Sequence, residues 1–269
     1  MNRDRGPLRS HALTAALVLI IFGGILLDVA VPAYGQAVAS GAAWLTLLLL
    51  FLTRTAQNRS ELFFCLAIAT IGEVFLGFMW KLYDYRLHNL PLFIPPGHAV
   101  VYAAGRRIST AMPAWLPLTL AATMLPVAIA GILLRSDTQA ALWFAVLVIC
   151  MIAARERVFL ATMFLFALAI ETYGTRLGAW QYVAREPWFG LTTRTSPPLW
   201  AGTFYCVLDL IVTRLSNFSR SRISRLRNAA RFYSFKKERL MASAASLADK
   251  AAASTQPASK PFFVQSPAK

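Results

Sequence analysis

The sequence predicts an all-α, polytopic helical membrane protein, with about eight transmembrane helices in two parallel four-helix repeats and a basic amphipathic tail helix. The composition is the first reason: of 269 residues, 57% are hydrophobic and 14% are charged, and the mean hydropathy is +0.54. The second is that the charges form short clusters between apolar stretches long enough to cross a hydrocarbon core of ~30 Å. The third is that Arg59 to Glu73 and Arg157 to Glu171 have the same length and apolar character, which indicates an internal duplication.

Apolar stretches between these charge clusters define the expected spans, because ~20 apolar residues cross a bilayer. The eight spans are expected at about 12–31, 37–53, 61–80, 96–111, 113–134, 139–154, 158–175 and 197–214. The fourth is short, because Arg106 and Arg107 follow soon after its start. It crosses the bilayer only if the side chains of these arginines extend to the headgroups; the alternative is a half-helix. The first could instead be a cleaved signal peptide, although it is long for one.

These spans predict five regions along the chain. They are a cytoplasmic N-terminus (1–11), a first four-span repeat (12–111), a second four-span repeat (113–214), a basic amphipathic juxtamembrane helix (215–240) and a disordered tail (241–269). Arginine and lysine are denser in the loops that share a side with the N-terminus. The positive-inside rule therefore predicts a multi-pass protein of the inner (plasma) membrane with both termini cytoplasmic.

A glutamate lies at an equivalent place in each predicted repeat, in the outer half of its span. Carboxyl groups inside a membrane are costly and are often functional, so Glu73 and Glu171 predict a site between the repeats. A buried carboxyl that stays protonated could donate a proton or bind a cation. A structural hydrogen bond between helices is the other interpretation, and repetition alone does not exclude it.

Aromatic and ionisable residues follow both glutamates on the predicted outer side. An aromatic belt with snorkelling cations explains many of them, but it explains the acids and histidines less well. The candidate catalytic residues are therefore Glu73, Glu171, Asp84 and His98, and the candidate substrate-binding residues are Trp80, Tyr83, Tyr85, His88, Arg176, Trp180, Tyr182 and Trp200.

Metal binding and soluble-enzyme chemistry have little support. His98 has no second residue at metal-ligand spacing, so no metal site is predicted. The three cysteines lie at unrelated spacings in apolar stretches and read as core residues. Phosphate-binding glycine loops and nucleophile elbows are absent, and no cofactor is identified. Asp209, in the eighth span near Arg214, is expected to form a structural ion pair.

Basic residues dominate the chain beyond the last span and account for much of the net charge of +15. Ile223, Leu226, Ala230 and Tyr233 fall on one helical face, with arginines mostly on the others. This pattern is typical of a helix lying on anionic inner-leaflet lipids, and it requires no nucleic-acid partner.

The second cassette, Glu171-x(6)-Gly-Ala-Trp180-Gln-Tyr182 with Pro187 and Pro197-Pro-Leu-Trp-Ala-Gly-Thr-Phe-Tyr205, resembles cassettes of the small lycopene cyclases and carotenoid hydratases. The likeness covers about forty residues per half, and the first half departs from it, with Lys-Leu-Tyr-Asp-Tyr at the matching place. It implies that acidic residues protonate an isoprenoid or other lipid. The remaining alternatives are a secondary transporter of a small solute or ion and a non-catalytic membrane scaffold.

Overall fold

The computed structural model describes residues 5–53, 55–135 and 137–254, and the chain is predominantly helical there. In order, the elements are α1 (Arg5–Ala30), α2 (Gly35–Thr53), α3 (Ala56–Glu73), the π-helix η1 (Val74–Met79), β1 (Tyr83–Tyr85), α4 (Ile94–Ile108), the 3-10 helix η2 (Ser109–Ala111), α5 (Leu116–Arg135), α6 (Thr138–Ala153), α7 (Arg157–Leu177), β2 (Trp180–Tyr182) and α8 (Ala201–Ser254). Contacts divide the chain into two compact units, one ending at Asn217 and the other beginning at Phe218.

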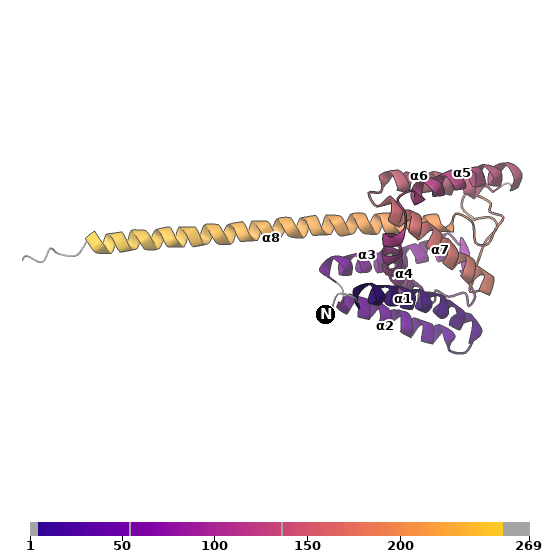
Figure 1. The fold of residues 1–269 in the computed structure, drawn as a ribbon, viewed down its shortest axis with the longest axis horizontal. Helices are drawn as coiled ribbons and strands as arrows, with labels where there is room; N and C mark the ends of the chain where they lie inside the picture. Colours follow the sequence, from indigo (N-terminus) through magenta and orange to yellow (C-terminus); the bar gives the residue numbers. More distant parts are fainter. Residues whose placement is uncertain (1–4, 54, 136, 255–269) are drawn as a thin grey trace, which may run out of the picture. The chain divides into compact units, whose positions relative to one another are not determined.

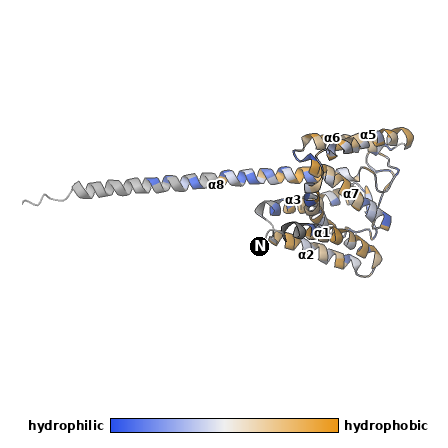
Figure 2. Ribbon diagram, in the orientation of Figure 1, coloured by the Kyte–Doolittle hydropathy of each residue, from blue (hydrophilic) through white to orange (hydrophobic). Residues whose placement is uncertain are grey.

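Five helices are long and apolar enough to cross a membrane, as expected of the predicted class of helical membrane protein. They are His11–Ala30, Gly35–Thr53, Asn58–Met79, Leu116–Leu134 and Arg157–Leu177. Hydrophobic residues predominate along α2, α5 and α6 in Figure 2, although α6 is shorter than the other two. The predicted eighth span is the first part of the longer helix α8. The count of eight spans and the division into two repeats stay predictions.

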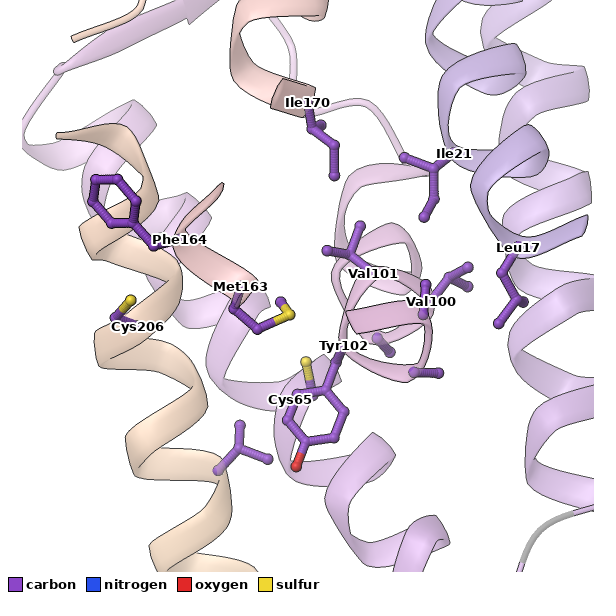
Figure 3. Close-up of a cluster of buried hydrophobic side chains, with 14 of the residues drawn as sticks. Leu17, Ile21, Cys65, Val100, Val101, Tyr102, Met163, Phe164, Ile170 and Cys206 are labelled. Atoms are coloured by element: carbon purple, nitrogen blue, oxygen red, sulfur yellow. The ribbon is translucent and has the colours of Figure 1, made fainter. Parts of the chain in front are cut away.

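The predicted fourth span, α4, forms the centre of the first unit. Its 15 residues give a length of about 22 Å, too short to cross a bilayer unaided. Two prolines occupy its first turn, where their missing N–H groups cost nothing. Helices α1, α2, α3 and α7 pack around it. Figure 3 shows Val100, Val101 and Tyr102 of α4 within the apolar core. Other helices cover α4, so its sequence does not need the long apolar stretch that is typical of a transmembrane helix.

Two short strands join the segments that follow the two glutamates. β1 pairs with β2 in antiparallel register, with Tyr83 opposite Tyr182 and Tyr85 opposite Trp180. Further backbone hydrogen bonds extend the pairing at each end, from Arg86 N to Ala179 O (2.9 Å) and from Val183 N to Leu82 O (3.0 Å). Aromatic residues well separated in the sequence therefore lie side by side. The sequence analysis predicted these aromatic clusters but no strand.

The first part of α8 packs on α7, and the rest belongs to the second unit. Gly202 lies so close to α7 that an added Cβ would sit 2.4 Å from the Phe164 carbonyl oxygen. Beyond Phe218 the helix continues to Ser254, as drawn in Figure 1. The prediction of a disordered tail from residue 241 therefore differs from the structure, where residues 241–254 are helical. Its remainder, 255–269, lies outside the described residues.

Candidate functional site

A cavity of about 420 Å³ lies in the first unit and has one polar end. Apolar side chains of α1, α2, α4 and α8 form most of its wall, including Ile21, Ala43, Val101 and Leu208. Ile71 of α3 also lines it and is 69% exposed, so the cavity reaches the surface beside a membrane-spanning helix. Its lining residues that are ionisable, or are tyrosine or tryptophan, are Glu73, Trp80, Tyr83, Tyr85, His98, Trp143, Glu171, Trp180, Tyr182 and Tyr205.

Glu73 ends α3 and is surrounded by hydrogen-bond donors. Its Oε2 accepts the hydroxyls of Tyr83 (2.7 Å) and Tyr85 (2.6 Å), which alternate along β1. Its Oε1 lies 2.8 Å from Nε2 of His98, in the first turns of α4. The π-helix η1 begins directly after Glu73; such segments are frequent at functional sites. This buried carboxyl is therefore held by three neighbours from two elements.

Glu171, on α7, has a closely similar set of donors. Its Oε2 accepts Nε1 of Trp180 (2.7 Å) and the hydroxyl of Tyr182 (3.0 Å), both from β2. Its Oε1 accepts the hydroxyl of Tyr205 from α8 (3.1 Å). In each case the donors come from the following strand and the following helix. Both glutamates are buried, with 8% of Glu73 and 7% of Glu171 exposed, so neither carboxyl is left to bulk water.

Aromatic contacts join the two carboxyl sites. The ring centroids of Tyr83 and Tyr182 are 5.2 Å apart, and those of His98 and Tyr205 are 5.0 Å apart. The sites therefore meet through residues that also bind the carboxyls. The two glutamates line one cavity, as the expectation of a shared site requires.

The strand tyrosines act as donors over the whole physiological pH range. Burial, followed by the nearby Glu73 carboxylate, raises the pKa of Tyr83 and that of Tyr85 well above the usual value of 10. Burial and Glu171 do the same to the pKa of Tyr182. Three donors around a carboxyl stabilise its ionised form. The expected proton donor is therefore better sought at His98, whose Nδ1 is buried without a hydrogen-bond partner.

Four of the predicted site residues lie elsewhere. Asp84 and His88 form an exposed pair with each other, and Arg176 is exposed on the last turn of α7. Trp200 is 1% exposed and belongs to a separate small cluster with Ala128 and Ala140. Within the part of the chain that the structure describes, these four are not among the residues lining the cavity. Neighbouring strand residues point to opposite faces, which explains why Asp84 departs from Tyr83 and Tyr85.

The sequence analysis missed several residues of the site. Tyr205 was part of the quoted cassette but was not selected; it follows its Pro-Pro pair by seven residues, whereas His98 follows its own by two. Trp143 of α6 lines the cavity and packs on Phe204, with ring centroids 4.3 Å apart. The position of Trp143 in the sequence did not indicate a site, since the sequence of α6 is almost uniformly apolar.

A second polar cluster lies toward the other end of α3 and α4. The Tyr102 hydroxyl donates to Glu61 (3.1 Å) and accepts from Arg106 Nε (3.1 Å), and Arg106 also pairs with Glu156. Its guanidinium lies 4.0 Å from the Phe159 ring centroid. This network ties α3, α4 and the start of α7 together, and it explains how Arg106 can occupy an apolar bundle.

Asp209 differs from every other acid in the bundle. It is fully buried, and neither carboxyl oxygen has a hydrogen-bond partner. The expected ion pair with Arg214 does not occur among the described residues, because Arg214 Nη2 donates to the Ala153 carbonyl (2.6 Å). A buried acid without partners is costly as an anion, so Asp209 must hold a proton or a cation.

Comparison with known protein families, curated proteins and solved structures found no match for this chain.

Proposed function

We propose that this is an inner-membrane protein that carries out acid–base chemistry on an isoprenoid or other lipid in the apolar cavity. The observation that carries the proposal is the cavity itself: an apolar chamber that reaches a membrane-spanning helix and ends at two buried glutamates and a histidine. Lipid-binding cavities require apolar walls with a few convergent polar groups. An aqueous solute would gain little from such walls.

In the proposed reaction His98 exchanges the proton. Its Nε2 is held by Glu73, so the imidazole is oriented and its positive charge is stabilised when Nδ1 is protonated. Glu171 and the tyrosine rings would stabilise positive charge that develops on the hydrocarbon, through the carboxylate and through cation–π contacts. The distribution of arginine and lysine among the loops, through the positive-inside rule, is the basis for placing the site near the outer leaflet, with both termini cytoplasmic.

The test combines lipid analysis with a cavity-filling variant. Lipid extracts of a deletion strain should lack a product, or accumulate a precursor, that the wild-type gene restores. Gly97→Leu should fail to restore it, because Gly97 lines the cavity and a Cβ there meets nothing within 4 Å. Gly41→Leu is the matched control, since Gly41 is equally unobstructed in α2 but does not line the cavity. An unchanged lipid profile in the deletion strain would contradict the proposal.

A secondary transporter is the second candidate, and Asp209 favours it. A proton or cation held at Asp209 would lie between the cavity and the cluster around Arg106, on a route across the bundle. Asp209→Asn should then abolish proton-coupled uptake while leaving lipid composition unchanged. If the protein instead carries out the lipid reaction, loss of its function should change lipid composition and leave proton-coupled uptake unchanged.

The second unit is proposed to bind anionic inner-leaflet lipids. Arg222, Arg225, Arg231, Lys236 and Arg239 are exposed along this part of α8. Each basic residue near an anionic surface contributes ~1 kcal/mol, and salt screens it. A peptide of residues 216–235 should gain helicity on anionic vesicles and dissociate as salt rises. Equal binding to neutral vesicles would exclude this role.

A further inference from the structure

A second cavity, of about 460 Å³, lies beside the loop that follows β2. Its lining residues are Tyr182, Ala184, Arg185, Thr192, Thr193, Arg194, Thr195 and Ser196. Two of these are arginines and five carry hydroxyl groups, and of the described residues none that lines it is acidic. Two acids contact lining residues from behind: Asp137, which is 7% exposed, accepts the Thr193 hydroxyl at 3.3 Å, and Glu171 accepts the Tyr182 hydroxyl at 3.0 Å. This cavity is therefore basic, unlike the apolar one.

A hydrogen-bonded hairpin fixes the positions of both arginines. Thr193 N donates to Ala184 O (2.9 Å) and Glu186 N donates to Leu191 O (3.0 Å), with Arg185 opposite Thr192. Gly190 at the turn has φ +67°, and a Cβ there would lie 2.9 Å from Nη2 of Arg185. The glycine therefore allows the turn and leaves room for the guanidinium. The backbone at Arg185 is therefore fixed before any ligand arrives.

Two hydroxyl groups of the pocket have donor capacity left over. Thr195 Oγ1 is buried without a hydrogen-bond partner. Ser196 Oγ accepts the backbone N–H of Tyr182 (3.1 Å), so its own proton can point to another acceptor. Arginine forks and hydroxyl donors together match the oxygens of a phosphate group.

Tyr182 lines both cavities, so the basic pocket and the apolar chamber adjoin each other across this residue. A ligand that reaches both has an apolar chain and an anionic head. We infer that the pocket beside Arg185 and Arg194 binds the phosphate headgroup of an anionic lipid whose hydrocarbon chain occupies the apolar cavity. The inference rests on the proposed function, because it takes the apolar cavity to hold a lipid.

Tryptophan fluorescence can test the headgroup and the chain separately. Trp80, Trp143 and Trp180 line the apolar cavity, so lipids with brominated acyl chains should quench them when the chains enter. The full-length protein in detergent is titrated with brominated phosphatidic acid and with brominated diacylglycerol, which differ only in the phosphate. Phosphatidic acid should bind at least about tenfold more tightly, because only it can use the charge-assisted hydrogen bonds.

Variants locate that preference. Arg185→Gln with Arg194→Gln should reduce phosphatidic acid binding to the level of diacylglycerol, whereas Arg185→Lys should retain part of the preference. Arg176→Gln is the control, since Arg176 is an exposed arginine of α7 that lines neither cavity, and it should bind as wild type does. Circular dichroism on each variant verifies the fold.

Each remaining outcome contradicts a specific part of the inference or of the proposed function. Equal affinity of the wild type for the two lipids, or a preference that survives both glutamine substitutions, would overturn the inference and leave the proposed function standing. Displacement of phosphatidic acid by millimolar inorganic phosphate would assign the pocket to a soluble anion instead of a lipid. Absence of quenching by either lipid would overturn the proposed function as well.

Discussion

The two carboxyl sites differ at two positions, and the difference at the helix position concerns proton transfer. Glu73 accepts two tyrosine hydroxyls and contacts His98, whereas Glu171 accepts a tryptophan, a tyrosine and Tyr205. His98 and Tyr205 each come from the helix after the strand and contact each other. Of the two, only the His98 imidazole has a second nitrogen that can take up a proton while the first stays bonded to the carboxylate. Under the proposed function the first half of the chain therefore exchanges the proton, and the second half holds a fixed negative charge.

The largest expected effect is at His98. His98→Gln retains a hydrogen bond to Glu73 but removes the second imidazole nitrogen, which carries the proton in the proposed reaction, so product formation should fall ~10²–10⁴-fold. Tyr205→Phe removes one of three donors to Glu171 and should cost about tenfold. Both are measured by lipid analysis of the complemented deletion strain. A larger loss in Tyr205→Phe than in His98→Gln would reverse the roles assigned to the two halves.

A comparison of double variants distinguishes the contribution of the Glu73 site from that of the Glu171 site. Glu73 acts through His98, so the combined Glu73→Gln, His98→Gln variant should be no less active than His98→Gln alone. Glu171 acts separately, so Glu171→Gln should lower the activity of a Glu73→Gln protein further, by about tenfold or more. Product formation is the measurement. If Glu171→Gln had full activity, the fixed-charge role would be excluded and Glu171 would be a structural link.

The sequence predicted the site better than the fold around it. Glu73, Glu171, His98 and most of the aromatics were found because membrane-embedded acids are rare and because the pattern occurs twice. Asp84 and His88 were included because they are close in sequence, but strand alternation turns Asp84 away. Arg185 and Arg194 belong to the loop after the second cassette, and the sequence does not show that the hairpin brings them to one pocket.

Spans are hardest to recognise in the sequence where helices are covered by protein. Hydropathy detects exposure to lipid, and α4 is too short and too well enclosed to give that signal. The basic residues after Arg214 predicted a break at the membrane surface, yet α8 continues through them as one helix. The distribution of charged residues indicates where a helix leaves an apolar environment, but it does not indicate where the helix ends.

Glycines beside the two sites offer a smaller effect on stability. An added Cβ at Gly174 would lie 2.2 Å from ring carbons of Trp180, whereas at Gly77 it would lie 3.4 Å from Tyr83. Gly174→Ala should therefore lower the free energy of unfolding by about 1–3 kcal/mol through overpacking. Gly77→Ala should change it by less than about 1 kcal/mol. Thermal unfolding in detergent compares them, and equal effects would show that the second site is no more tightly packed than the first.

The smallest expected effect is on the loop after β2, in which Glu186 bonds to Trp80 of the first half. Glu186 is 1% exposed and accepts Nε1 of Trp80 (2.6 Å) and the N–H groups of Trp188, Phe189 and Leu191. Burial raises the pKa of this carboxyl, but the four hydrogen bonds outweigh it and the pKa is lowered.

Because the folded-state pKa of Glu186 lies below the unfolded value of about 4.3, its stabilisation is complete above that value and is lost as the pH falls through the folded pKa. Proteolysis of the loop by an acid-active protease should therefore accelerate as the pH falls below about 4. In Glu186→Gln the loop should be cleaved faster at every pH, with little dependence on pH. The first-half loop is tied instead by Arg86, which donates to the Asp28 carbonyl (2.6 Å), and serves as the internal comparison. If cleavage in the second-half loop showed the same pH profile with and without Glu186, the carboxylate would not be what holds the halves together there.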